Sequence, residues 1–177
     1  MRKFGVYLLM FLLLSSFAMP VLADSAEPNI HYEAKEVRNL PESKMLVPKI
    51  TKISDDADFY KKIRNQSLFL PFGPGEWDYL GSSMFKSKSR TFYSGGGDLR
   101  IYIGIPKSGS TKWLFKLYEE DPAWDWTISS FELPKRTGTY SVDFDVRGWT
   151  DGDNGKAELH LKKLTYPFDS VTTDWFD

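Results

Sequence analysis

Residues 139–147 read Thr-Tyr-Ser-Val-Asp-Phe-Asp-Val-Arg, and this stretch decides the fold class. Its apolar and aromatic residues, Tyr140, Val142, Phe144 and Val146, alternate with polar or charged ones. Successive side chains of a strand point to opposite faces of a sheet. The stretch therefore predicts a strand with one buried face and one solvated face.

The same alternation recurs on both sides of this strand. It is clear in residues 99–105, 113–118 and 157–161, and it is weaker in three further segments, 79–85, 90–93 and 127–133. Past Leu161 the alternation slips, which predicts either a bulge near Lys162 and Lys163 or the end of the strand.

About seven short strands separated by turn residues are typical of a sandwich or a barrel, and we favour the sandwich. The predicted fold class is all-β: an antiparallel β-sandwich of about seven strands, preceded by an irregular N-terminal arm and one short helix. We expect its core to contain inward-facing residues of the strongest strands: Ile101, Ile103, Phe115, Tyr140, Val142, Phe144, Val146, Leu159 and Leu161.

Residues 1–23 have the pattern of a secretory signal peptide. Arg2 and Lys3 precede a short apolar run, and Val21-Leu22-Ala23 offers a small-residue cleavage site. The apolar run is far shorter than the roughly 20 residues that span a bilayer. We therefore expect cleavage after Ala23, secretion, and no membrane span in the mature chain.

Three segments are expected after the signal peptide. Residues 24–52 are charged and interrupted by prolines, which predicts an extended arm. Residues 53–74 contain Ser54 as a helix N-cap and acidic residues in the first turn, which predicts a short helix over 55–65 and then a linker rich in Pro and Gly. Residues 75–177 are expected to form the β-sandwich domain.

Composition limits the chemistry and the partners. The 177-residue sequence has no cysteine, which excludes disulfides, thiolate metal sites and a cysteine nucleophile, and fits a bacterial exported protein better than a eukaryotic one. Removing residues 1–23 takes two of the 23 basic residues and none of the 24 acidic ones, which leaves 21 against 24 and a net charge of -3. Nucleic-acid binding needs clustered Lys and Arg, so we expect no nucleic-acid partner.

One stretch resembles a known class of exported module. Residues 94–103, Ser-Gly-Gly-Gly-Asp-Leu-Arg-Ile-Tyr-Ile, and the later strand start Gly138-Thr139-Tyr140 are similar to bacterial β-sandwich modules of the pre-peptidase C-terminal type. The resemblance covers about residues 75–166. It implies a non-catalytic accessory or binding module and supplies no functional residue.

Residues 118–126, Tyr-Glu-Glu-Asp-Pro-Ala-Trp-Asp-Trp, form the most unusual segment, with four acids and two tryptophans in a predicted connection between strands. An indole ring can stack on the C–H face of a sugar while a carboxylate accepts its hydroxyl protons. The sequence therefore predicts ligand contacts at Trp124, Asp125, Trp126 and Asp121. Alternatively, the rings fold back and close the end of the core.

The same acids admit a second interpretation, an exported hydrolase. Such an enzyme needs two carboxylates about 5 to 10 Å apart, with the pKa of one raised by an apolar neighbour. The candidates are Glu119, Glu120, Asp121 and Asp125, and the sequence does not place them relative to one another.

Other motifs are better explained by structure than by chemistry. Asp151 and Asp153 suggest calcium ligands, but Gly155 and Lys156 break the EF-hand pattern, and Asn154-Gly155 is better explained as a hairpin turn. His160 is expected on the outward face of a strand, and neither it nor His31 has the partners of a Ser-His-Asp triad. We expect no metal and no cofactor.

The sequence thus predicts a secreted, non-enzymatic binding or interaction module at or near the cell envelope, with a polysaccharide or an envelope protein as its partner. A carboxylate-dependent hydrolase remains the alternative. A protein-protein factor such as an inhibitor, a toxin or an immunity protein, whose arm orders on binding, also remains open.

Overall fold

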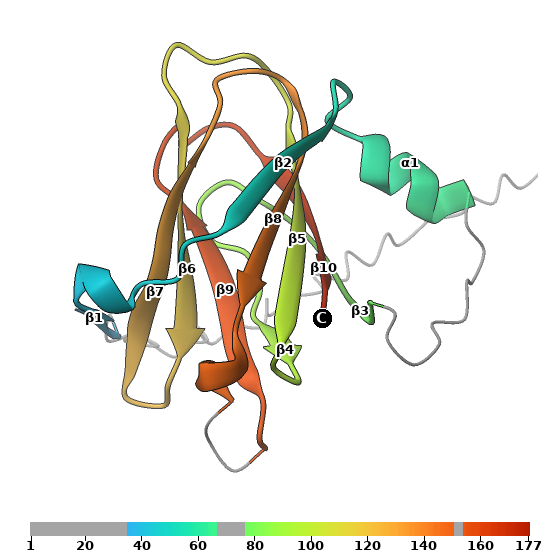
Figure 1. Ribbon diagram of the computed structural model, residues 1–177. Helices are drawn as coiled ribbons and strands as arrows, with labels where there is room; N and C mark the ends of the chain where they lie inside the picture. The colour runs from blue at the N-terminus through green and yellow to red at the C-terminus, as the bar shows by residue number, and fades with distance from the viewer. Residues whose placement is uncertain (1–34, 67–76, 151–153) are drawn as a thin grey trace, which may run out of the picture. The chain divides into compact units, whose positions relative to one another are not determined.

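The computed structural model describes residues 35–66, 77–150 and 154–177, and this part of the chain forms two five-stranded β-sheets (Figure 1). The predicted signal peptide, residues 1–23, lies outside the described residues, as do Asp151 and Asp153. Among the described residues, no helix has the length and hydrophobicity needed to cross a membrane.

The strands divide between the sheets as follows. Sheet A has the order β1-β7-β6-β9-β4 and is formed by β1 (Glu36–Asn39), β7 (Trp124–Leu133), β6 (Trp113–Glu120), β9 (Ala157–Lys163) and β4 (Phe92–Ser94). Sheet B has the order β2-β8-β5-β10-β3 and is formed by β2 (Lys49–Ser54), β8 (Gly138–Asp145), β5 (Asp98–Ile105), β10 (Val171–Phe176) and β3 (Tyr79–Phe85). Every described strand pair is antiparallel except β1 with β7.

The predicted all-β sandwich is confirmed, because the two sheets bury one common apolar core. Each of the nine residues expected in that core is buried. Aromatic contacts join the sheets across it: Phe92 of sheet A stacks on Trp175 of sheet B with ring centroids 4.3 Å apart, and Phe131 meets Phe144 edge-on at 5.7 Å. Such pairs add to the free energy gained from burial alone.

The seven predicted strands correspond to β3 to β9, and β9 ends at Lys163 without a register shift against β6. The slip past Leu161 therefore marks the end of the strand and not a bulge. Gly155 has φ of +62°, as the proposed turn at Asn154-Gly155 requires. The turn does not close a hairpin, because β8 belongs to sheet B and β9 to sheet A.

Three further strands have no clear alternation in the sequence. β1 and β2 come from the segment 24–52 in which an extended arm is expected, and β10 follows the last predicted strand. β1 and β2 are edge strands, each paired on one side. Their residues are less buried than those of central strands, so their sequences need no alternation of apolar and polar residues. β10 is central in sheet B, but it is short and its buried residues include the polar Thr173 and Asp174.

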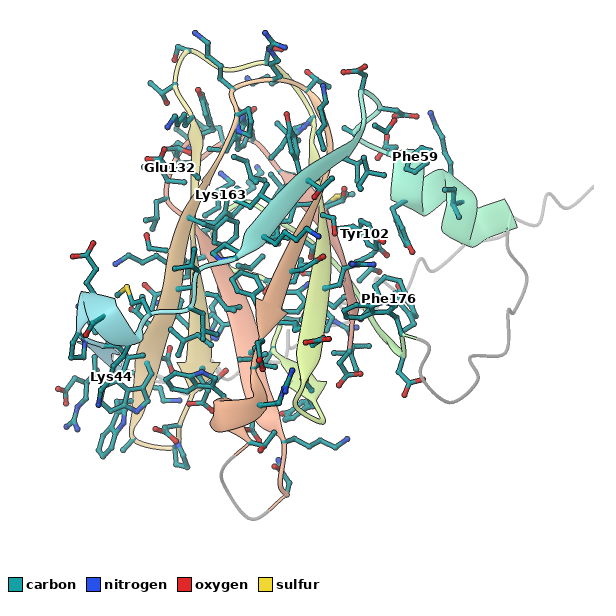
Figure 2. All side chains as sticks on the ribbon, viewed as in Figure 1. Lys44, Phe59, Tyr102, Glu132, Lys163 and Phe176 are labelled. Carbon is teal, nitrogen blue, oxygen red and sulfur yellow. The ribbon has the colours of Figure 1, made fainter. Side chains whose placement is uncertain are left out.

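The predicted helix is present but begins later, as α1 (Phe59–Gln66) with the expected start at Asp55 replaced by turns. The Thr139 hydroxyl donates to the Asp56 carbonyl at 2.6 Å and holds this segment against sheet B. Tyr60 then stacks on Tyr102 with centroids 3.8 Å apart, and Phe176 meets both rings edge-on. Figure 2 shows Tyr102 and Phe176 on the side of the sheet where α1 lies. α1 thus packs against part of the outer face of sheet B, around Tyr102 and Phe176.

Phe144→Ala should lower the free energy of unfolding by about 3 to 5 kcal/mol, because it empties a site that is almost fully buried and removes the contact to Phe131 across the sheets. Urea unfolding followed by tryptophan fluorescence measures this change. Tyr93→Ala, at an exposed position, is the control and should change stability by less than about 0.5 kcal/mol. Equal losses for the two variants would contradict this description of the core.

Gly104→Ala should displace the segment before α1. A Cβ atom at this position would lie 2.2 Å from the Ala57 carbonyl oxygen and 2.5 Å from the Thr172 hydroxyl oxygen. We expect a loss of about 1 to 3 kcal/mol and faster tryptic cleavage at Lys61 or Lys62. Gly148→Ala is the matched control, because a Cβ atom there meets nothing within 4 Å. Unchanged cleavage in Gly104→Ala would show that this contact does not hold the segment.

Candidate functional site

The predicted ligand contacts do not lie in a loop. Trp124, Asp125 and Trp126 open strand β7, and only Asp121 belongs to the tight turn before it, where its N–H donates to the Trp124 carbonyl at 3.0 Å. Because side chains alternate along a strand, Asp125 points to one face of sheet A and the two tryptophans to the other. The structure does not bring the rings and the Asp125 carboxylate together on one face.

Both tryptophans are half-buried at the edge of sheet A, beside β1. Trp126 packs against the core, as the alternative interpretation of this segment expects. The Arg38 guanidinium of β1 lies 3.7 Å from the ring centroid of Trp124 and covers one of its faces. At most one face of this indole is therefore available for stacking.

On the opposite, outer face of sheet A, Asp125 belongs to a compact polar cluster that contains a buried histidine. The cluster comprises His160 of β9, Tyr118 and Glu120 of β6, Asp125 of β7, and Lys35 before β1; we call it the His160 cluster. His160 Nδ1 lies 3.7 Å from Glu120 Oε2, and His160 Nε2 lies 3.8 Å from Asp125 Oδ2. The Tyr118 ring stacks parallel to the imidazole at 5.1 Å.

His160 is fully buried, and neither ring nitrogen has a hydrogen-bond partner among the described residues. Burial lowers the pKa of His160 to about 4, and the nearby Lys88 charge acts in the same direction. The negative charges of Asp125 and Glu120 oppose this shift but do not reverse it. The imidazole is therefore neutral at pH 7.

Ion pairs hold both carboxylates of the cluster, and a hydrogen bond also holds Glu120. Lys35 Nζ lies 3.0 Å from Asp125 Oδ1 and 3.6 Å from Glu120 Oε1, and the Thr91 hydroxyl donates to Glu120 Oε2 at 2.6 Å. Burial raises the pKa of the Glu120 carboxyl, but the Thr91 hydrogen bond and the charges of Lys88 and Lys35 outweigh it, so the pKa is lowered. The Glu120 carboxylate is thus favoured in its ionised form.

The four acids considered for a hydrolase separate in the fold. Glu120 and Asp125 are direct cross-strand partners on the outer face of sheet A. Glu119 points to the inner face and is fully buried, and Asp121 lies in the turn. Only Glu120 and Asp125 could act together on one bond. In the described part of the chain, no group of three or more His, Cys, Asp or Glu side chains is arranged to hold a metal ion.

The sequence discounted His160 and missed its environment. The alternation along β9 placed it correctly on the outward face with Glu158 and Lys162. Its neighbours come from β6 and β7, and they are set by the register that pairs Tyr118 with His160 and Glu120 with Asp125. The alternating patterns of the segments that form β6, β7 and β9 each show which residues face outward. Only the order and register of these strands in the sheet show that the outward-facing residues are neighbours.

Two comparisons identify relatives of this chain. A family described as "YndA coiled coil domain" matches residues 79–175. The uncharacterised protein YndA of Bacillus subtilis (strain 168) is 34% identical over 110 residues, which cover 59% of this chain and 76% of that protein. The described part of residues 79–175 consists of strands β3 to β10, their turns and one short 3-10 helix, with no α-helix. Coiled coil does not describe the fold of this segment.

Because His160 is buried, the protein should become less stable as the pH is lowered below about 6.5. The unfolded state, with a histidine pKa of 6.5, takes up a proton below that pH, whereas the folded state does so only near pH 4. The free energy of unfolding should therefore decrease between pH 6.5 and pH 4 by about 3 kcal/mol from this residue alone. Denaturant unfolding across this range measures the loss.

His160→Gln is the control variant, because it retains His31 and removes only the buried imidazole. The difference between the pH slopes of the wild type and this variant isolates His160 from the carboxylates that titrate in both. Identical slopes would contradict a neutral, buried His160.

Proposed function

This chain belongs to the YndA family, and we propose that it is a secreted, non-enzymatic binding module that acts at or near the cell envelope and has a glycan as its ligand. The signal-peptide pattern of residues 1–23 supports export. The arrangement of side chains on the outer face of sheet A supports binding.

A single observation carries the glycan proposal: an exposed tyrosine faces a carboxylate on that outer face. Tyr93 of β4 is 52% exposed and is the direct cross-strand partner of Glu158 on β9. Glu158 lies two residues before His160, so it shares a face with Glu120 and Asp125. An aromatic ring beside carboxylates offers a stacking surface for the sugar ring and acceptors for its hydroxyl groups.

The fold holds this pair in place. The neighbours of Tyr93 in β4, Phe92 and Ser94, are buried, and Phe92 stacks on Trp175 across the core. Glu158 accepts a hydrogen bond from the Asn154 amide at 2.5 Å. Binding residues carried on packed strands lose little conformational freedom when a ligand binds, which favours affinity.

The carboxylate-dependent hydrolase has one observation in its favour, the direct pairing of Glu120 with Asp125. A general acid at neutral pH needs a raised pKa, as an apolar pocket provides. The pKa of Glu120 is lowered, because its carboxylate is engaged by Thr91 and by lysine charges. This electrostatic setting favours a binding surface over acid catalysis.

The proposal predicts that Tyr93→Ala loses about fivefold or more in affinity for insoluble glycans, because stacking contributes roughly 1 kcal/mol or more. A pull-down on cell-wall and extracellular polysaccharides, followed by a binding isotherm on the best of them, measures the loss. Tyr79→Ala, a partly exposed tyrosine on edge strand β3 of sheet B, is the matched control and should bind as the wild type does.

Trp124→Ala and Trp126→Ala belong in the same series, because the start of β7 is the contact that the sequence predicts. If these two variants are no longer retained on the glycan and Tyr93→Ala still is, the ligand contact lies at the β1–β7 edge. Absence of any retention of the wild type would exclude a glycan ligand.

A further inference from the structure

Three lysines lie side by side across the outer face of sheet A. Lys116 of β6 and Lys162 of β9 are direct cross-strand partners, and Lys88 forms an isolated β-bridge with Lys162. Adjacent strands are about 4.8 Å apart. Lys88, Lys162 and Lys116, which we call the lysine row, therefore occupy three neighbouring backbone positions along a line of about 10 Å, at right angles to the strands.

This arrangement costs folding free energy. Like charges directly opposite each other on neighbouring strands repel and destabilise a sheet. The pKa of Lys162 is lowered by burial, and the charges of Lys88 and Lys116 add to this effect although Asp125 and Glu120 oppose it. A sheet surface with no role beyond solubility would be more stable with a neutral or acidic residue at one of these positions.

The charges of the lysine row are poorly neutralised. Lys88 has one distant ion pair, 4.0 Å from Nζ to Glu120 Oε2, and the Lys162 ammonium lies 4.4 Å from the ring centroid of Tyr118. Across residues 35–66, 77–150 and 154–177, neither Lys116 nor Lys162 has an ion pair. The whole chain carries a net charge of -1, so this local excess of positive charge runs against the overall balance.

We propose that the lysine row binds the anionic groups of an acidic glycan, a polymer whose sugar units carry carboxylates or phosphodiesters. This inference rests on the proposed glycan-binding function and specifies the class of glycan. The polymer crosses the strands along the row, because Glu120, Asp125 and Glu158 form a parallel acidic band on the same face that repels anions. Its uncharged sugar faces lie toward Tyr93, which is paired with Glu158 at the β4 end of that band.

The geometry favours a glycan over a nucleic acid. Single-stranded nucleic acids are bound along extended basic grooves with several stacking aromatics. The lysine row is only about 10 Å long, and the adjacent acidic band would repel a continuous phosphate backbone leaving it. Tyr118, the other aromatic residue beside the row, is buried between His160 and Lys162 and offers no free ring face.

The test measures binding of the full mature protein to four immobilised polymers: polygalacturonate, a glycerol-phosphate teichoic acid, neutral dextran and single-stranded DNA. We expect binding to at least one of the two acidic glycans, at least tenfold tighter than to dextran, and weakening as salt rises, because exposed charges are screened. The first two polymers distinguish carboxylate from phosphodiester ligands.

The variant is Lys88→Gln combined with Lys116→Gln and Lys162→Gln, and it should lose at least tenfold in affinity for the acidic glycan. The matched control is Lys44→Gln combined with Lys49→Gln and Lys61→Gln, three exposed lysines elsewhere with no ion pair in the described part of the chain. It changes net charge equally and should bind as the wild type does.

A stability measurement separates binding from folding. Lys116→Gln alone should raise the melting temperature, because it relieves the repulsion across β6 and β9, while it weakens binding to the acidic glycan. A fall in both quantities would indicate that Lys116 serves the fold, and would overturn the proposal.

The remaining outcomes also decide the matter. Equal binding to dextran and to the acidic glycans, unchanged in the triple variant, would overturn the lysine row as a site and leave the glycan-binding function standing. DNA binding as tight as acidic-glycan binding would replace the proposal with a general polyanion surface. Failure to bind any glycan would overturn both proposals.

Discussion

Burial of one alternate set of side chains between two sheets is the constraint on which the rest of this structure depends. With no cysteine in the chain, no disulfide shares the task of holding the sandwich together. Contacts such as Phe92 on Trp175 and Phe131 on Phe144 join the sheets directly. Because side chains alternate along a strand, burying one residue in this core turns the residues before and after it to the outer face of the sheet.

The outer faces of the two sheets have different roles. On sheet B, Tyr60, Tyr102 and Phe176 form an aromatic contact that docks α1, and Arg100 forms two hydrogen bonds of 2.8 Å with Asp143 beside it. The chain itself covers this part of the face. On sheet A, a neutral buried histidine lies between the carboxylates of Glu120 and Asp125, and three lysines lie in a row. Sheet A therefore carries the functional proposals.

The two charged features of sheet A are physically coupled. Lys88 lowers the pKa of His160 and, together with Lys35, also that of Glu120. Burial, reinforced by the Lys88 charge, thus keeps the imidazole neutral, and the Thr91 hydrogen bond with the charges of Lys88 and Lys35 favours the ionised Glu120 carboxylate. The acidic band in turn limits where an anion can approach. This division into an acidic and a basic band is fixed by strand register, since a shift of one residue would turn every one of these side chains to the other face.

The sequence by itself determined the fold class, the seven strands β3 to β9 and the nine core residues tested, because alternation is a local property that one strand shows alone. It also placed His160 on an outward face. Only the tertiary structure decided that Trp124 and Trp126 point away from Asp125 and that His160 lies between Glu120 and Asp125. The same holds for the alignment of Lys88, Lys116 and Lys162. These relations depend on strand order and on the register between segments that are distant in sequence. Strands β1, β2 and β10 complete the sheets, and they are held mainly by pairing with strands distant in the chain.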